Sequence, residues 1–170
     1  RMLLKHGQFK KILGMDVSYR ALKKASSRLH LDEMSPRMRE RIELIQGSLT
    51  YHDDRLAGYD AAVLVEVIEH LELERLAAFE RVVFEFARPQ SVILTTPNAE
   101  YNQLYPSLEG GAMRHDDHRF EWSRSEFQKW VDKISETYEY DPQISAIGEV
   151  DPTVGPSSQM VVFTLKTALA

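Results

Sequence analysis

Short apolar runs in this chain alternate with longer stretches in which apolar residues recur at the spacing of a helix. The run at 59–66 is apolar without alternation, which is typical of a parallel strand that is covered on both faces. Other runs of similar length also predict strands. The strands expected before the middle loop are 11–17, 41–46, 59–66 and 91–96.

Three helices are expected from the stretches with helical spacing. Ser18 suits the N-cap of the first helix, and Pro89 ends the second. Ser123 and Glu126 form the sequence pattern of a capping box at the start of the third. The apolar positions that mark the three helices are Ala21, Leu22, Ala25 and Leu29; Leu73, Leu76, Phe79, Val83 and Phe86; and Phe127, Trp130, Val131, Ile134 and Tyr138.

This order of elements predicts an α/β fold, with a mostly parallel, doubly wound sheet over a single domain, residues 1–170. Two late strands, near 143–147 and 159–165, follow each other without a helix, so we expect them to pair antiparallel at one edge. Residues 32–41 are expected to form a loop with at most a helical turn. The longest irregular stretch is 98–118, and long loops in compact domains are usually functional or disordered.

Composition narrows the class of protein. The chain is 43% hydrophobic and 28% charged, as in ordinary globular proteins. No apolar run approaches the roughly eighteen residues of a membrane span, so no membrane association is expected. Cysteine is absent, which excludes disulfides and thiolate chemistry and fits a cytoplasmic protein. The net charge of −5 argues against a protein that binds long nucleic acid through many phosphates. It does not exclude one that recognises only a terminal nucleotide.

Ligands of such sheets bind at the carboxyl ends of the strands, where Asp16, Ser48 and Glu66 stand. Asp16 is placed to accept both hydroxyls of a ribose, and an N-cap or first-turn acid is the alternative. Gly47, Ser48 and Leu49 are placed near an adenine, or form a plain turn. Sheets that bind nucleotides normally begin with a strand and a glycine-rich loop. Gly7 is the one glycine ahead of the first strand, so we expect that this unit is missing and that the chain is a fragment.

A second group of residues has the chemistry of a metal site. Glu66, Glu69 and His70 stand at i, i+3 and i+4, so they share one face if the chain turns helically there. His118, with His115 in reserve, adds imidazole, and this mixed donor set suits Mg²⁺ or Mn²⁺. The alternatives are acids that favour a helix dipole and histidines that are merely solvated.

The residues resemble the S-adenosylmethionine-dependent methyltransferases of small RNA, which modify the 2′-hydroxyl of the 3′-terminal ribose. The resemblance is closest to the methyltransferase domain of the bacterial RNA-repair members. The block at 117–122 combined with the block at 96–102 is its most specific part. The matching segments are Gly14–Ser18, Gly47–Tyr51, Glu66–Leu71, Thr96–Asn102 and Asp117–Trp122.

The resemblance implies a Rossmann-like class I methyltransferase and a role for particular residues. Catalysis and metal binding, with Mg²⁺ or Mn²⁺, would belong to Glu66, Glu69, His70 and His118. The cofactor would be held by Asp16, Val17, Ser48 and Leu49. The substrate would be contacted by Arg114, Arg119 and Asn98.

The same resemblance implies an RNA 3′ end as the substrate and an RNA end-healing or ligation protein as a partner. Arg114, Arg119 and Arg124 are candidates to meet the last phosphates, or else are solvated surface charges. Two other functions remain open at this point. One is a metal-independent methyltransferase acting on a small molecule, and the other is a binding module that has lost its cofactor loop.

Overall fold

The computed structural model describes residues 2–106, 108 and 112–167. By its internal contacts the chain divides into two units, Arg1–Leu56 and Ala57–Ala170, and each is described by itself. The expectation of one methyltransferase domain over residues 1–170 therefore stays a prediction.

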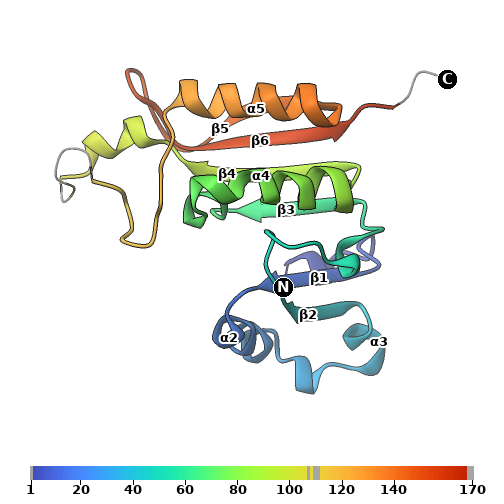
Figure 1. The fold of residues 1–170 in the computed structure, drawn as a ribbon. Helices are drawn as coiled ribbons and strands as arrows, with labels where there is room; N and C mark the ends of the chain where they lie inside the picture. The colour runs from blue at the N-terminus through green and yellow to red at the C-terminus, as the bar shows by residue number, and fades with distance from the viewer. Residues whose placement is uncertain (1, 107, 109–111, 168–170) are drawn as a thin grey trace. The chain divides into compact units, whose positions relative to one another are not determined.

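The first unit is built on two parallel strands (Figure 1). Their register pairs Ile12 with Ile42 and Asp16 with Gln46, so the carboxyl ends of both strands lie at one edge. Leu4, Leu31 and Ile42 are the buried centre of the small core around this sheet. The elements are α1 (Met2–Lys5), β1 (Ile12–Asp16), α2 (Tyr19–Leu29), η1 (Leu31–Glu33), α3 (Pro36–Arg39), β2 (Ile42–Gln46) and η2 (Asp54–Leu56).

Helix α2 begins and ends as local chemistry requires. The Ser18 hydroxyl accepts a hydrogen bond from the Ala21 N–H at 3.2 Å, which confirms the expected N-cap. The helix ends at His30, whose φ of 56° turns the chain left-handed. This turn leads into η1, so the stretch expected to be a loop holds two short helical turns, η1 and α3.

The second unit has a four-stranded sheet in the order β3-β4-β6-β5. Strands β3 and β4 are parallel, whereas β6 is antiparallel to both β4 and β5. The elements are β3 (Ala61–Val65), η3 (Ile68–His70), η4 (Leu73–Arg75), α4 (Leu76–Glu80), the π-helical η5 (Arg81–Ala87), β4 (Ser91–Pro97), η6 (Ala99–Leu104), α5 (Arg124–Tyr138), β5 (Tyr140–Asp151) and β6 (Gly155–Leu165).

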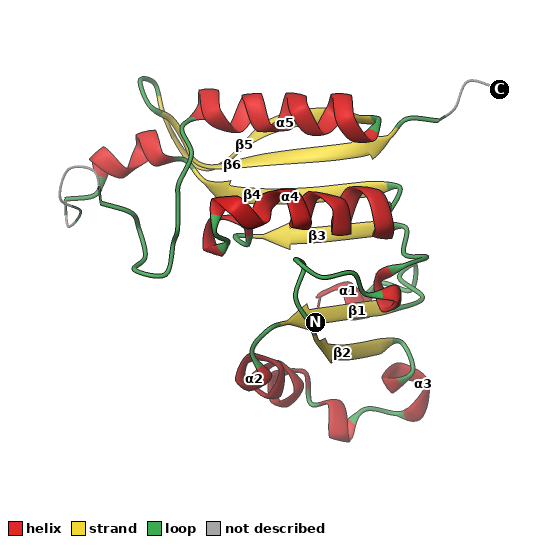
Figure 2. Cartoon of the chain, in the orientation of Figure 1, coloured by secondary structure: helices red, strands yellow, loops and turns green. Residues whose placement is uncertain are grey.

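Helices α4 and α5 lie side by side on one face of this sheet (Figure 2). Phe84 is fully buried, and its ring lies 5.1 Å from that of Phe163 on β6 and 6.4 Å from that of Trp130 on α5. The two helices are also joined by a buried carboxylate. Glu80 accepts hydrogen bonds from the Trp130 indole at 2.8 Å and from the Lys133 ammonium at 2.6 Å, which satisfies its charge.

The α/β fold, its parallel strand pairs and its antiparallel edge are confirmed, and three details differ. The pairing forms two separate ladders among the described residues, β1-β2 and β3-β4-β6-β5. The helix expected through Phe86 is a succession of 3-10, α and π turns. Strand β5 extends beyond the expected 143–147 at both ends. Most of its residues are exposed, so the hydrophobic pattern of the sequence did not indicate its full length.

No helix among the described residues combines the length and the apolar composition that crossing a membrane requires.

Candidate metal and cofactor sites

Glu66 follows β3 directly, and its backbone takes a left-handed turn with φ of 51°. Few residues other than glycine adopt this conformation, so neighbouring contacts must hold it. The Glu66 N–H donates to the Thr95 carbonyl oxygen at 3.2 Å, and the Thr95 hydroxyl donates to the Glu66 carboxylate at 3.0 Å. These contacts end the strand and hold Glu66 against β4.

The helical turn expected here begins later than Glu66. The single 3-10 turn η3 contains Glu69 and His70, whereas Glu66 precedes it. The three side chains therefore do not share the face of one continuous helix. The charge of the Glu66 carboxylate nevertheless contributes to the raised pKa of Glu69.

Glu69 is a fully buried carboxylate with one unsatisfied oxygen. Its Oε2 accepts a hydrogen bond from the Thr96 hydroxyl at 3.1 Å, while its Oε1 has no hydrogen-bond partner in the described part of the chain. Burial raises the pKa of the Glu69 carboxyl to about 7, and the charges of Glu66 and Glu121 add to the shift. An unpaired buried carboxylate is costly, so this oxygen calls for a cation or a proton.

His118 comes from the loop before α5, and the fold brings it to the same place. The Arg119 N–H donates to the Glu69 carbonyl oxygen at 2.7 Å, which ties this loop to η3. His118 is 3% exposed, and its Nδ1 lies 2.6 Å from the Glu121 carboxylate, whose side chain is 2% exposed. A carboxylate on Nδ1 fixes the tautomer of the ring and leaves Nε2 as the free nitrogen.

Glu69, His70 and His118 form one cluster, although about 50 positions separate them in the sequence. One ligand atom from each lies within 4.8 Å of the others. The imidazoles of His70 and His118 meet edge to face, with ring centroids 4.8 Å apart. The structure therefore brings together three of the four residues that the sequence predicted as metal ligands.

This cluster fits a divalent cation. In an octahedral site, neighbouring ligand atoms that each lie about 2.0–2.1 Å from Mg²⁺ are roughly 3 Å apart, and opposite ones are roughly 4.2 Å apart. The three ligand atoms lie within 4.8 Å of one another, so they would have to move closer together to hold an ion. The unsatisfied oxygen of Glu69 and the buried imidazole of His118 are the donors that an ion would use, whereas Glu66, the fourth expected ligand, lies outside this group of converging ligand atoms.

Two neighbours surround this cluster at its exposed side. The Nδ1 of His70 lies 3.3 Å from the carboxylate of Asp117, which is largely exposed. The ring of His115, the expected reserve ligand, is 5.1 Å from that of His118, but His115 is not in the group of converging ligand atoms.

The four expected cofactor residues all belong to the first unit and gather at one edge of its sheet. Asp16 ends β1, and its carboxylate accepts a hydrogen bond from the Ser18 N–H at 2.7 Å. Val17 is 66% exposed. Ser48 and Leu49 follow β2 at the same edge, and the Ser48 hydroxyl is 2.9 Å from that of Thr50. The four residues therefore lie at the carboxyl ends of parallel strands, which is where ligands of such sheets bind.

The expected substrate residues have structural partners. Asn98 is fully buried, and its amide donates to the carbonyl oxygens of Val154 and Pro156 at 2.9 and 2.8 Å. The Arg114 guanidinium donates to the carbonyl oxygens of Asn98 and Ser157 at 2.9 and 2.5 Å. Their role toward substrate stays a prediction.

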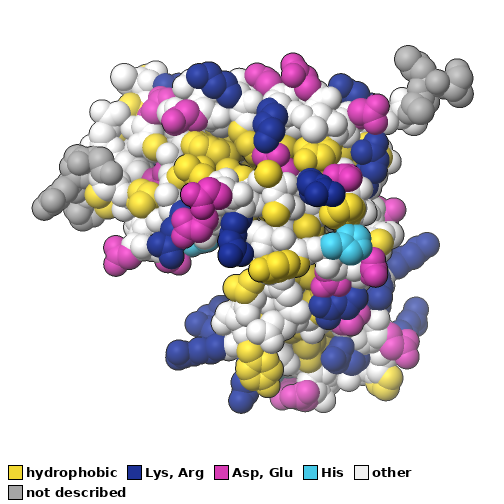
Figure 3. Space-filling model, viewed as in Figure 1, with side chains coloured by type: hydrophobic (Ala, Val, Ile, Leu, Met, Phe, Trp, Pro, Cys, Tyr) yellow, Lys and Arg dark blue, Asp and Glu magenta, His cyan; other side chains and the backbone are white. Residues whose placement is uncertain are grey.

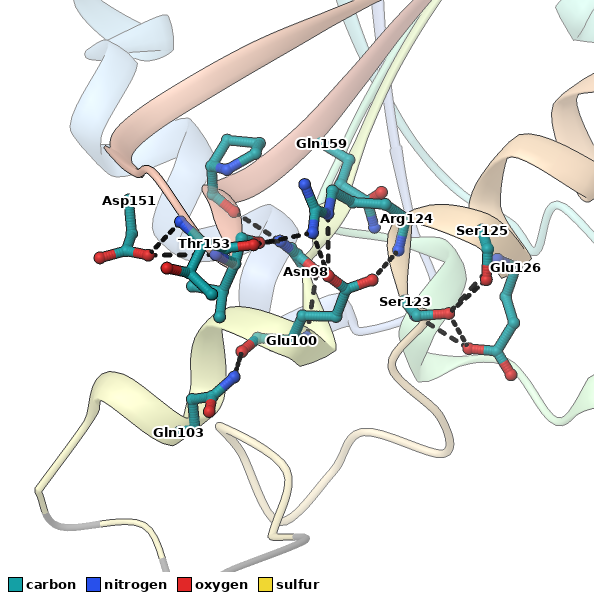
Figure 4. A network of polar contacts seen from close by, with 12 residues as sticks. Asn98, Glu100, Gln103, Ser123, Arg124, Ser125, Glu126, Asp151, Thr153 and Gln159 are labelled. Atoms are coloured by element: carbon teal, nitrogen blue, oxygen red, sulfur yellow. Dashed lines mark hydrogen bonds and ion pairs between the residues drawn. The ribbon is translucent and has the colours of Figure 1, made fainter.

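Arg119 and Arg124 each face a carboxylate. Arg119 lies 3.1 Å from Glu72 and is half exposed, so it remains accessible. Arg124 is anchored more firmly, because its guanidinium donates to Glu100 at 2.6 Å and to the Thr153 carbonyl oxygen at 3.2 Å (Figure 4). Arg124 therefore acts in this structure as a tie between α5 and the β5–β6 turn.

Sequence reasoning assigned no role to Glu121 and Thr96, which complete the cluster. Both lay inside the motifs that carried the resemblance, at 117–122 and 96–102, and that position was the available signal. Their partners, His118 and Glu69, could be identified only once the loops were in place.

Comparison with known proteins gives relatives for both units. No protein-family model matches the chain. A small RNA 2′-O-methyltransferase of Xenopus tropicalis is 45% identical over 126 residues, which are 72% of this chain and 34% of that protein. The chain spans between about a third and just over two fifths of the length of the curated relatives it matches first.

Solved structures agree with this relationship. The methyltransferase domain of the bacterial protein CtHen1 is 51% identical with a TM-score of 0.86, and the match covers 96% of this chain and 83% of that one. A chain of the Pnkp1/Rnl/Hen1 RNA repair complex is 20% identical with a TM-score of 0.68, over 96% of this chain and 34% of that one. At that identity the second likeness concerns the fold alone.

Proposed function

Because this chain belongs to the family of small RNA 2′-O-methyltransferases, we propose that it transfers the methyl group of S-adenosylmethionine to the 2′-hydroxyl of an RNA 3′-terminal ribose. The observation that carries the proposal is the cluster of Glu69, His70 and His118, in which Glu69 and His118 are buried and His70 is exposed. The unsatisfied buried carboxylate beside two imidazoles favours a metal-dependent methyltransferase over a metal-independent one.

The cofactor belongs, in this proposal, at the carboxyl edge of β1 and β2. Asp16 would accept the hydroxyls of the cofactor ribose. Val17, Ser48 and Leu49 would surround the adenine. The exposure of Val17 supports this assignment, because an apolar side chain left in solvent at a strand end is available to a ligand.

The metal would be held by Glu66, Glu69, His70 and His118, and Mg²⁺ or Mn²⁺ suits this mixture of oxygen and nitrogen donors. A bound divalent ion would lower the pKa of the ribose hydroxyl and orient its oxygen. Glu121 keeps the His118 ring in one tautomer and one orientation. Thr96 and Thr95 hold the carboxylates of Glu69 and Glu66 in place.

In the proposed reaction the bond between the methyl carbon and the sulfonium sulfur breaks as the bond between that carbon and the ribose 2′-oxygen forms. S-adenosylhomocysteine and the 2′-O-methylated RNA are the products, and the hydroxyl proton must be accepted. His70 or His118 is the proposed acceptor, and whichever of them takes the proton on its free nitrogen cannot bind the metal through that nitrogen at the same time. His70 is 38% exposed and can pass the proton on to solvent.

The substrate is proposed to be an RNA with a free 3′ end, since only a terminal ribose offers both of its vicinal hydroxyls. An RNA end-healing or ligation protein is proposed as a partner, as the resemblance to the bacterial RNA-repair members implies. The cytoplasmic location expected from the sequence stays a prediction.

Three RNA oligonucleotides with different 3′ ends test the function. We expect methyl transfer to an RNA that ends in a free diol, and none to the same RNA with a 3′-phosphate. An RNA with a 3′-deoxy end keeps the nucleophile but loses the second hydroxyl, so we expect transfer to fall strongly. Nuclease digestion and mass spectrometry locate the methyl group on the terminal nucleoside.

Chelation separates the metal from the rest of the proposal. EDTA should abolish transfer, and added Mn²⁺ should restore it. Transfer that survives chelation would remove the metal role while leaving the methyltransferase in place. Equal transfer to the free and the 3′-phosphorylated RNA would contradict the terminal-diol substrate.

A further inference from the structure

We infer that the exposed basic face of helix α2 binds the phosphate backbone of the RNA strand behind its 3′ end. This inference rests on the proposed function, because it supplies the surface that such a substrate needs. The basic face is defined here as Arg20, Lys23, Lys24 and Arg28.

Charge is divided very unevenly between the two units. Residues 1–56 contain twelve lysines and arginines against seven acids, whereas residues 57–170 contain nine against nineteen. The first unit is therefore net positive and the second strongly negative. The net negative charge of the unit that holds Glu69, His70 and His118 disfavours an RNA backbone, so the net positive unit is the better source of affinity for the strand.

Helix α2 holds a concentration of cations with no acid to neutralise them. Its sequence from Tyr19 to Leu29 contains no aspartate or glutamate. All four members of the basic face are exposed, and none of their side chains makes a hydrogen bond or ion pair with another described residue. Figure 3 shows Lys and Arg side chains projecting around the position of α2 in Figure 1.

Three other arginines of the same unit already bind groups within the protein. Arg41 donates to the carbonyl oxygens of Leu4 and Phe9, and Arg39 donates to that of Ile42. Arg55 is paired with Asp53 at 2.6 Å. These arginines hold the fold together, whereas those of the basic face have no such role.

The spacing of the basic face suits a linear polyanion. Arg20, Lys24 and Arg28 recur every four residues, so they line one side of the helix over about 12 Å. Between the stems of Lys24 and Arg28 lies a shallow depression floored by Ala21 and Ala25. Small apolar residues between long cations leave room for a ribose beside its phosphate.

The first turn of α2 adds an aromatic side chain. Tyr19 is 68% exposed, so its ring is accessible to a base. Single-stranded nucleic acids are commonly bound by a basic track together with aromatic rings on which bases stack. Tyr19 follows Asp16 by three positions, so a strand lying along α2 leads toward the edge proposed for the cofactor.

A triple substitution tests the basic face in the full chain. Lys23→Gln, Lys24→Gln and Arg28→Gln remove three charges and keep good helix formers. The matched control is Lys5→Gln, Lys10→Gln and Arg37→Gln, three exposed cations of the same unit outside α2. Binding of a 20-nucleotide RNA is measured over a range of salt concentrations.

We expect the α2 variant to bind RNA roughly tenfold more weakly or worse at low salt, with the slope of log K against log salt reduced by about 2. Its KM for methylation of the long RNA should rise, while transfer to a 3′-terminal trinucleotide stays as in the unchanged chain. Unaltered helix content in circular dichroism shows that the fold is intact.

The outcomes separate the two proposals. Equal weakening by the control variant, or no weakening by the α2 variant, would overturn the basic face as the RNA track. Failure of the unchanged chain to methylate either RNA would count against the proposed function. The slope of log K against log salt would still test whether the basic face of α2 binds RNA.

Discussion

At the scale of single residues, Glu121 decides which nitrogen of His118 is free. The two side chains are almost completely buried and 2.6 Å apart, so the carboxylate holds the Nδ1 proton. Glu121 also accepts hydrogen bonds from the Arg114 N–H and the Asn102 amide. These bonds fix the carboxylate, and through it the imidazole, before any ligand arrives.

Glu121→Gln should therefore weaken the binding of Mn²⁺ about 10- to 100-fold, because an amide no longer fixes the tautomer of His118 or raises its basicity. Isothermal calorimetry with Mn²⁺ alone measures the effect without any dependence on activity. Glu74→Gln, an exposed acid on η4, is the control and should leave the affinity unchanged. Full Mn²⁺ affinity in the Glu121 variant would show that its carboxylate serves the fold only.

At the scale of elements, helix α5 carries the capping box that the sequence predicted. The Glu126 N–H donates to the Ser123 hydroxyl at 3.3 Å, and the Ser123 N–H donates to the Glu126 carboxylate at 2.9 Å. The Ser123 hydroxyl also donates to the Glu126 carboxylate at 2.6 Å, and this bond, with that of the Ser123 N–H, lowers the pKa of Glu126 below its ordinary 4.5. The ionised carboxylate therefore stabilises the folded state.

This capping box predicts a dependence of stability on pH. Because the pKa of Glu126 is lower in the folded chain than in the unfolded one, its contribution is complete above pH 4.5 and is lost as the pH falls through the folded value. Glu126→Gln should lower the free energy of unfolding by about 0.3–1 kcal/mol at pH 7. The difference from the unchanged chain should shrink toward zero on acidification.

Urea unfolding at pH 7 and pH 3 measures both values. Glu136→Gln, an exposed acid near the other end of α5, serves as the control and should show neither the loss nor its pH dependence. A Glu126 variant whose deficit is the same at both pH values would mean that charge at this helix end does not matter.

At the scale of the whole molecule, the candidate residues fall into two groups on two units. Asp16, Val17, Ser48 and Leu49 lie in residues 1–56, while Glu66, Glu69, His70 and His118 lie in residues 57–170. The proposed chemistry therefore depends on both units, and the two groups can be tested separately.

Asp16→Ala should reduce the affinity for S-adenosylmethionine at least about tenfold, because a ribose loses its charged acceptor. The same variant should keep its Mn²⁺ affinity. His118→Ala should do the opposite and should also abolish methyl transfer. Two calorimetric titrations per variant check this division, and an equal loss of cofactor binding in both variants would contradict it.

Local sequence determined much of the fold by itself. The apolar runs located β1 to β4, and the polar caps at Ser18 and Ser123 located the starts of α2 and α5. These features depend on neighbours within a few residues, so they can be inferred from composition and spacing alone. The strand–helix alternation then indicated an α/β fold, since parallel strands need crossover connections.

Only the tertiary structure decided how the candidate residues are buried and which partners they have. The sequence offered Glu69 and His118 as ligands, but the buried unsatisfied oxygen of one and the carboxylate partner of the other arise from loops about 50 positions apart. Arg114 was expected to meet substrate, and the structure adds that its guanidinium also donates to two backbone carbonyl oxygens. Burial and pairing are set by which segments meet across the sheet, and a pattern read along the chain does not contain that information.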